Sequence, residues 1–130
     1  MAKTHATDAD VTAFLDAIPD ERRRAEGHAL RGLLERVTGE QAAMWGATMV
    51  GFGSARSGTG EWFVVGFAPR KAALTLYGVY DDDAVDPQFE ELGPHTVGKG
   101  CLYLKRLDAV DPGVLEALVS RAWAKRAPTA

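Results

Sequence analysis

The sequence predicts an α+β domain in which helices from both ends of the chain cover one face of an antiparallel sheet. Residues 44–80 hold three short apolar runs with alternating spacing, and a glycine-rich loop joins two of them, as expected for consecutive antiparallel strands. Apolar residues on both sides of this stretch recur at spacings of three and four, which is typical of amphipathic helices. This order of helices, strands and helix favours one α+β domain with about four or more strands.

The length and charge of the chain limit its domain organisation and its classes of partner. Its 130 residues fit one domain, 1–130, and we expect the ends at 1–7 and 127–130 to fray. The net charge of −3 has the wrong sign for nucleic-acid or membrane binding, and no apolar run reaches the ~18 residues of a membrane span. The N-terminal residues lack the apolar core of a secretory signal, and the single cysteine, Cys101, allows no internal disulfide. These features predict a cytoplasmic protein that binds neither nucleic acid nor membranes.

Two helices are expected before the strands. Thr7 or Asp8 can cap the first, whose apolar stripe has helical spacing. The second is expected from about 20 to 37, and Gly39 stands where a left-handed cap would end it. Its first turns carry the basic run 22–24, which we interpret as a solvated helix face, with a site for phosphate or an acidic partner as the alternative. The stripe of the first helix consists of Val11, Phe14, Leu15 and Ile18.

The strands of the predicted sheet follow from alternating side chains. We expect three strands at 48–52, 61–67 and 74–80, and a fourth at 101–105. Residues 61–67 are apolar on both faces, which favours a central position in the sheet. The residues before the first strand, 41–45, are interpreted as a short helical turn.

An acidic loop, a short helix and a long final helix complete the predicted fold. The loop is expected at 81–86, and the short helix at 87–92, closed by Gly93. Asp111 is the expected cap of the final helix, and Pro112 is tolerated in its first turn. The apolar stripe of this helix is the clearest in the chain and consists of Val114, Leu115, Leu118, Val119, Ala122 and Trp123.

The sheet face opposite the helices is expected to carry several aromatic side chains. Alternate side chains of a strand lie on the same face of a sheet, so the expected strands place one set of residues together on this face. They are Met49, Trp62, Tyr77, Cys101 and Tyr103. A face of this kind is rarely left bare in water, so we consider three explanations: cover by the chain's own elements, a homodimer interface, and a small-molecule site. The small-molecule hypothesis adds cations and a loop histidine that lie nearby in the sequence. Its residues are Trp45, Trp62, Arg70, Lys71, Tyr77, His95, Lys99 and Tyr103.

The acidic loop and the short helix after it form a candidate metal site. Hard cations such as Fe²⁺, Mg²⁺ and Ca²⁺ take oxygen ligands, so weak iron binding is chemically reasonable, although the pattern does not match an EF-hand loop. The alternative is an ordinary solvated loop. We predict no firmly bound cofactor here, and weakly bound iron as the hypothesis to test. The candidate ligands are Asp81, Asp82, Asp83, Asp86, Glu90 and Glu91.

No catalytic motif is present in the sequence. The loop at 51–60 has two Gly-X-Gly pairs but lacks the lysine and the following helix of a phosphate-binding loop, so we interpret it as a hairpin loop. His95 and Cys101 have the residue types of a base and a nucleophile, but a small apolar residue in a strand explains Cys101 more simply. We therefore predict that the protein is not an enzyme and assign no catalytic residue.

Five short segments, in order, resemble the YdhG-like family, a domain of unknown function. The family commonly has serine in the turn where this chain has Ala68. The resemblance covers most of the chain and implies a small α+β domain. One related member is described as a frataxin-like iron chaperone, which implies iron binding through surface carboxylates and delivery to a partner. The segments are Met44–Gly46, Val50–Gly53, Gly66–Lys71, Leu74–Tyr77 and Gly100–Leu104.

Two classes of function follow from these observations. The first is a binding protein without enzymatic activity that carries iron, as the resemblance and the acidic residues suggest. The second is a pocket protein that binds a small organic anion on the aromatic sheet face, where apolar walls and a few cations would meet. A homodimeric interaction module that uses the same face is a further alternative.

Overall fold

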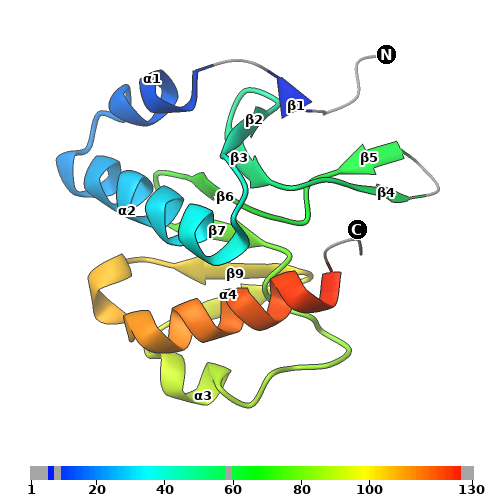
Figure 1. Ribbon diagram of the computed structural model, residues 1–130. Coiled ribbons are helices and arrows are strands. Elements are labelled where there is room, and N and C mark those ends of the chain that lie inside the picture. Colours follow the sequence, from blue (N-terminus) through cyan, green and yellow to red (C-terminus); the bar gives the residue numbers. More distant parts are fainter. Residues whose placement is uncertain (1–5, 8–9, 58–59, 127–130) are drawn as a thin grey trace.

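The computed structural model describes residues 6–7, 10–57 and 60–126, and it confirms the α+β fold (Figure 1). Within these residues, seven antiparallel strands form one sheet in the order β1-β2-β3-β6-β7-β9-β8, and two more form a separate ribbon. The sheet consists of β1 (Ala6–Thr7), β2 (Ala43–Trp45), β3 (Met49–Phe52), β6 (Val65–Pro69), β7 (Leu74–Tyr77), β9 (Cys101–Leu104) and β8 (Thr96–Gly98). The ribbon consists of β4 (Ala55–Ser57) and β5 (Gly60–Trp62). The helices are α1 (Val11–Asp16), α2 (Glu21–Thr38), α3 (Phe89–Leu92) and α4 (Pro112–Arg126), with a 3₁₀ turn, η1 (Leu107–Ala109).

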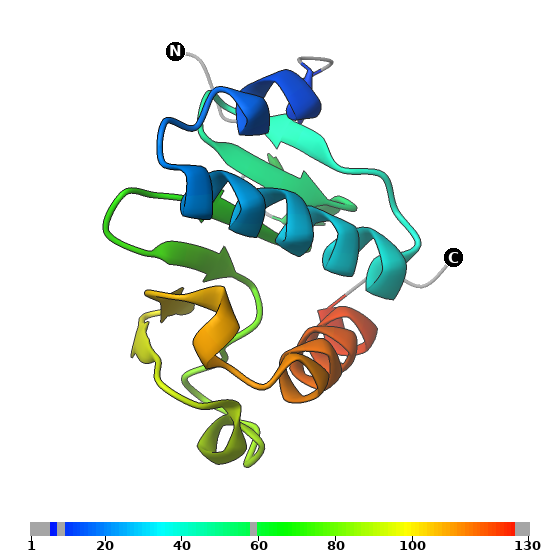
Figure 2. The same ribbon diagram turned by 90° about the vertical axis from the view of Figure 1, so that its left-hand side faces the viewer.

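The core lies between the sheet and the two long helices. Figure 2 shows α2 and α4 on the same side of the sheet. Directly paired residues of neighbouring strands share a face, so the row Val50, Phe67, Leu76 and Leu102 crosses the sheet beneath these helices. All four side chains are fully buried. The helices contribute a matching set of buried side chains, which are Leu30 and Leu34 from α2 and Leu115, Leu118 and Val119 from α4.

The helix boundaries follow the expected capping residues, with one correction. Asp10 caps α1, because its Oδ1 accepts a hydrogen bond from the N–H of Ala13 at 3.1 Å. Thr7 is wrong as the cap because it belongs to β1, and Asp8 lies outside the described residues. Gly39 ends α2 in the left-handed conformation, with φ 72°, as predicted.

The final helix is confirmed with its predicted cap. Asp111 Oδ1 accepts hydrogen bonds from the N–H groups of Gly113 (2.9 Å) and Val114 (3.1 Å). The short helix α3 and the acidic loop before it also lie where they were expected. Among the described residues, no helix combines the length and the apolar character needed to cross a membrane.

Three predictions about strands are wrong. Residues 43–45 are not helical: they form β2, which pairs between β1 and β3, with Met44 buried in the core on one face and Trp45 buried against Phe63 on the other. The run 61–67 is not one strand, because it breaks at residues 63–64 and its two parts join different sheets. The third predicted strand ends at Tyr77 rather than at 80.

The two ends of the chain were expected to fray. Ala6–Thr7 instead pair with β2 as the edge strand β1, because the backbone of β2 offers them hydrogen-bond partners. Residues 1–5 and 127–130 lie outside the described residues.

A buried ion pair ties the start of α2 to the chain after β9. Arg23 belongs to the basic run that we expected on a solvated helix face, yet it is only 5% exposed. Its Nη1 donates to Glu26 Oε1 at 2.7 Å, and its Nη2 donates to the carbonyl of Lys105 at 3.3 Å. Glu26 Oε2 accepts from the N–H of Leu107 at 2.8 Å. The solvated-face interpretation is therefore wrong for Arg23, because backbone groups about eighty residues away provide its surroundings.

Candidate functional site

The sheet face turned away from α2 and α4, here called the outer face, carries the expected aromatic residues on its strands. Trp45 pairs with Met49 at one end, and Tyr77 pairs with Cys101 at the other. Tyr103 pairs with a threonine of β7 beside them. The prediction that Trp62 stands on a strand of this sheet is wrong, because Trp62 comes from β5 in the separate ribbon.

At the end formed by β2, β3 and β6, the chain covers its own outer face. Trp45 is 1% exposed and Phe63 is 3% exposed, and their rings meet edge to face with centroids 5.6 Å apart. Trp62 stacks on Phe63, with centroids 4.6 Å apart. A Cβ atom on Gly51 would lie 2.5 Å from Trp45 Cδ1, and one on Gly66 would lie 2.9 Å from Phe63 Cε1. Glycines in β3 and β6 therefore let aromatic rings lie directly on the backbone, and they leave no room there for a ligand.

The other end of the outer face is polar and more open. Arg70 Nη2 donates to the hydroxyl of Tyr77 at 3.2 Å. A hydrogen bond between Tyr103 and the thiol of Cys101 raises the pKa of Tyr103 above its ordinary value. The Tyr103 ring extends over β8, where a Cβ atom on Gly98 would lie 2.8 Å from the Tyr103 hydroxyl oxygen.

Beyond Tyr103 lies a cavity of about 460 Å³, which we call the His95 pocket. It opens between β9 and the loop that carries His95. The carbonyl of Gly93 can only accept a hydrogen bond, so His95 Nδ1, 2.7 Å away, carries a proton and donates. His95 Nε2 is then left for a guest molecule. The lining residues are Pro94, His95, Thr96, Tyr103, Lys105, Arg106 and Ala109.

The His95 pocket brings together only part of the sequence-predicted ligand site. His95 and Tyr103 line it, while Arg70 and Tyr77 lie on the same outer face without lining it. The other predicted residues are elsewhere. Trp45 and Trp62 belong to the covered end, Lys71 lies in the β6–β7 turn, and Lys99 lies in the β8–β9 turn.

Sequence reasoning missed two cations of this pocket, Lys105 and Arg106. Both follow β9, and the ion pair of Arg23 and Glu26 holds the backbone on either side of them. Arg106 forms two hydrogen bonds with Asp108, at 2.8 and 2.9 Å, which lower the pKa of Asp108. One signal of this site was available in the sequence. Two cations, Lys105 and Arg106, follow directly on the predicted strand that carries Tyr103.

The predicted metal ligands point in different directions and are partly engaged by donors. Asp81 accepts from the N–H of Asp83 (3.0 Å) and from Lys125 Nζ (3.2 Å), which together lower its pKa. Asp82 accepts from the N–H of Gly100 at 2.8 Å. Glu90 and Glu91 are exposed on α3. Within the part of the chain that the structure describes, no three His, Cys, Asp or Glu side chains converge on a point that could hold a metal ion.

Asp86 is held by a cation from the final helix. Its Oδ2 accepts from Arg121 Nε at 2.5 Å, and its Oδ1 accepts from the N–H of Gln88 at 2.9 Å. Arg121, and then this backbone N–H, lower the pKa of Asp86 below its ordinary 3.8. Arg121 also donates to the side chain of Gln88.

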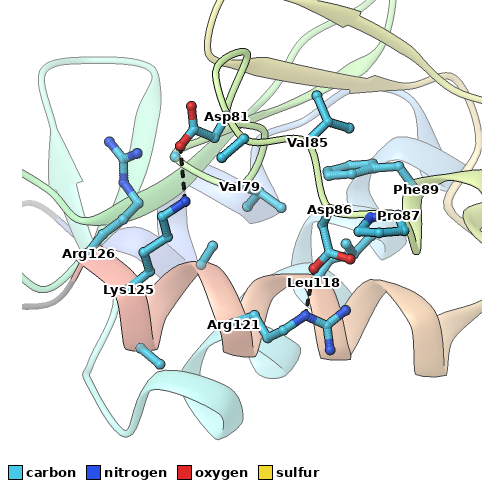
Figure 3. A pocket seen from close by; sticks show the side chains of 14 residues that line it. Val79, Asp81, Val85, Asp86, Pro87, Phe89, Leu118, Arg121, Lys125 and Arg126 are labelled. Carbon is cyan, nitrogen blue, oxygen red and sulfur yellow. Dashed lines mark hydrogen bonds and ion pairs between the residues drawn. The ribbon is translucent and has the colours of Figure 1, made fainter.

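Asp81 and Asp86 stand at the mouth of a second and larger cavity, of about 710 Å³, which we call the α4 cleft (Figure 3). It lies between residues 78–89 and the second half of α4. Figure 3 shows the two ion pairs, Lys125 with Asp81 and Arg121 with Asp86, crossing it at separate points. Sequence reasoning missed this cleft because its two walls are far apart in the chain.

No protein-family model matches the chain, and no curated protein or solved structure matches it. The resemblance to the YdhG-like family therefore stays a prediction from the residues.

Proposed function

We propose that this chain is a binding protein, without enzymatic activity of its own, that holds a small organic anion in the His95 pocket. The observation that carries the proposal is the composition of the lining. Among the described residues, two cations, Lys105 and Arg106, line the cavity and no carboxylate does, while His95 Nε2 can donate to an anion only when the ring carries a second proton. Because Asp108 already pairs with Arg106, Lys105 is the main recognition group.

The walls of the pocket indicate the rest of the ligand. Tyr103, Pro94 and Ala109 offer an apolar body and an aromatic face beside the cations. A cavity of about 460 Å³ lies within the range of roughly 300–1,000 Å³ that is usual for small-molecule sites. An aromatic or branched carboxylate fits this arrangement, with its apolar body against Tyr103 and its oxygens toward Lys105.

The same geometry gives less support to the iron-carrier hypothesis. Asp81 and Asp86 accept hydrogen bonds from cations, and an incoming metal ion would have to displace them. The remaining predicted ligands do not converge with these two among the described residues. Cys101 is a free, half-buried thiol, which fits a reducing compartment, and we place the proposed function in the cytoplasm.

The proposal is tested by titrating ¹⁵N-labelled protein with benzoate and with its neutral isostere benzamide. We expect saturable amide shifts for benzoate at residues 94–96 and 103–109. Lys105→Gln is expected to weaken benzoate binding about tenfold or more, because a hydrogen bond to a charged group contributes ~1.5–3 kcal/mol.

Lys99→Gln is the matched control, because it removes the same charge from the neighbouring β8–β9 turn without touching the cavity. Benzamide is expected to bind more weakly than benzoate to the wild type. Scattered, unsaturable shifts, or an equal effect of Lys99→Gln and Lys105→Gln, would refute the proposed site.

A further inference from the structure

The α4 cleft has an apolar floor that belongs to the rigid core. Val79, Phe89 and Leu118 are 7%, 5% and 2% exposed, and all three line the cleft. Val85, from the acidic loop, is 49% exposed at its mouth (Figure 3). This side chain is one of few large apolar groups that the described residues leave in water, and it extends the apolar surface outward from the floor.

The rim of the cleft carries an excess of positive charge. Arg121 projects from one turn of α4, and Lys125 and Arg126 project from the next; they share the rim with two carboxylates, Asp81 and Asp86 (Figure 3). The cation of each ion pair is exposed to solvent: the side chains of Arg121 and Lys125 are 50% and 58% exposed. Exposed pairs of this kind are each worth only ~0–1 kcal/mol, so they do not prevent another anion from sharing these cations.

We propose that the α4 cleft is a second ligand site, which takes an amphipathic anion: an apolar chain with one carboxylate at its end. The chain would lie on Val79, Phe89 and Leu118, between the two ion pairs. The carboxylate would face Lys125 and Arg126 at the end of α4. A volume of about 710 Å³ accommodates a longer apolar body than the His95 pocket does. The site shares no lining residue with that pocket, so it does not depend on the function proposed above.

Octanoate is the probe for this site, and 1-octanol is its neutral counterpart. We expect octanoate to cause saturable amide shifts in ¹⁵N-labelled protein at residues 78–89 and 118–126. Ala124→Trp, on an exposed lining residue, is expected to fill the mouth and abolish these shifts. Ser120→Trp is the matched control, because Ser120 is exposed on the same helix and does not line the cleft.

A separate substitution tests whether the carboxylate of the ligand lies at the end of α4. Arg126→Gln is expected to weaken octanoate binding about tenfold and to leave 1-octanol binding unchanged. Lys71→Gln removes one positive charge far from the cleft and controls for net charge. Octanoate binding that survives Ala124→Trp, or equal affinity for 1-octanol and octanoate, would overturn the proposal. Benzoate binding at the His95 pocket, measured in the same samples, separates this failure from a failure of the proposed function.

Discussion

Replacing Glu26 by glutamine is expected to destabilise the protein more than a surface change would, because Glu26 neutralises a buried guanidinium. Arg23 and Glu26 are 5% and 6% exposed, and their side chains meet at 2.7 Å. Removing one charge from a buried pair costs about 3–5 kcal/mol, because the other charge is left uncompensated. Glutamine keeps an oxygen that can accept from the N–H of Leu107, so we place the cost of Glu26→Gln at the lower end, about 3 kcal/mol.

A second substitution tests the physical cause of this cost. Arg23→Met in the Glu26→Gln background removes the uncompensated charge and keeps the acceptor for Leu107. We therefore expect the double variant to be more stable than Glu26→Gln alone, since apolar replacement of a buried pair is often nearly neutral. Urea unfolding followed by tryptophan fluorescence gives the four free energies of unfolding needed for a double-mutant cycle.

The reasoning is refuted if the changes in the free energy of unfolding caused by the two substitutions are additive. If Arg23→Met lowers stability equally in the wild type and in the Glu26→Gln variant, then the two side chains are not coupled and the burial argument fails. Glu26 also positions the segment that carries Lys105 and Arg106, through Leu107. A folded Glu26→Ala variant, which removes this acceptor, should thus bind benzoate more weakly although Glu26 does not line the His95 pocket.

Three further predictions concern glycine contacts and pH. Gly51→Ala should cost about 1–3 kcal/mol, measured by urea unfolding, because its Cβ would lie 2.5 Å from Trp45. Gly32→Ala, on the exposed side of α2 with no atom within 4 Å of the new Cβ, should stabilise by about 0.5–1 kcal/mol. Arg121 lowers the pKa of Asp86 below 3.8, so this pair stabilises the fold above that pH and loses its effect as the pH falls through the lower, folded value. Arg121→Gln should therefore reduce stability at pH 6, and the difference from wild type should shrink as the pH falls below 3.8, as urea midpoints would show.

Elements governed by neighbouring residues in the chain were predictable from the sequence. The cap at Asp111 and the apolar stripe after it define α4 within about fifteen residues, so nothing remote had to be known. The strand β2 was missed for the opposite reason. Met44 and Trp45 are both buried, on opposite faces, so β2 shows no alternation of apolar and polar residues. The edge strand β8 is short and exposed, and it carries no apolar pattern either.

The candidate site was predictable only where one strand or loop carried it. Tyr103 and His95 were found because an aromatic strand residue and a loop histidine stand out individually. Lys105 and Arg106 were missed because their role depends on where η1 turns the chain, and the ion pair from α2 fixes that turn. Such an anchor joins residues about eighty positions apart, and no local spacing reveals it.

The first residue of α3, Phe89, lies close to both proposed sites. Phe89 lines the α4 cleft, and its ring centroid lies 5.8 Å from that of His95 and 5.2 Å from that of Tyr80. It is 5% exposed, so most of the ring belongs to the core and only a small part reaches the cleft. Irregular segments therefore form one wall of each proposed site, and they face helix α4 in one case and strand β9 in the other. This division explains why the fold followed from strand and helix patterns, whereas the sites needed the contacts between distant segments.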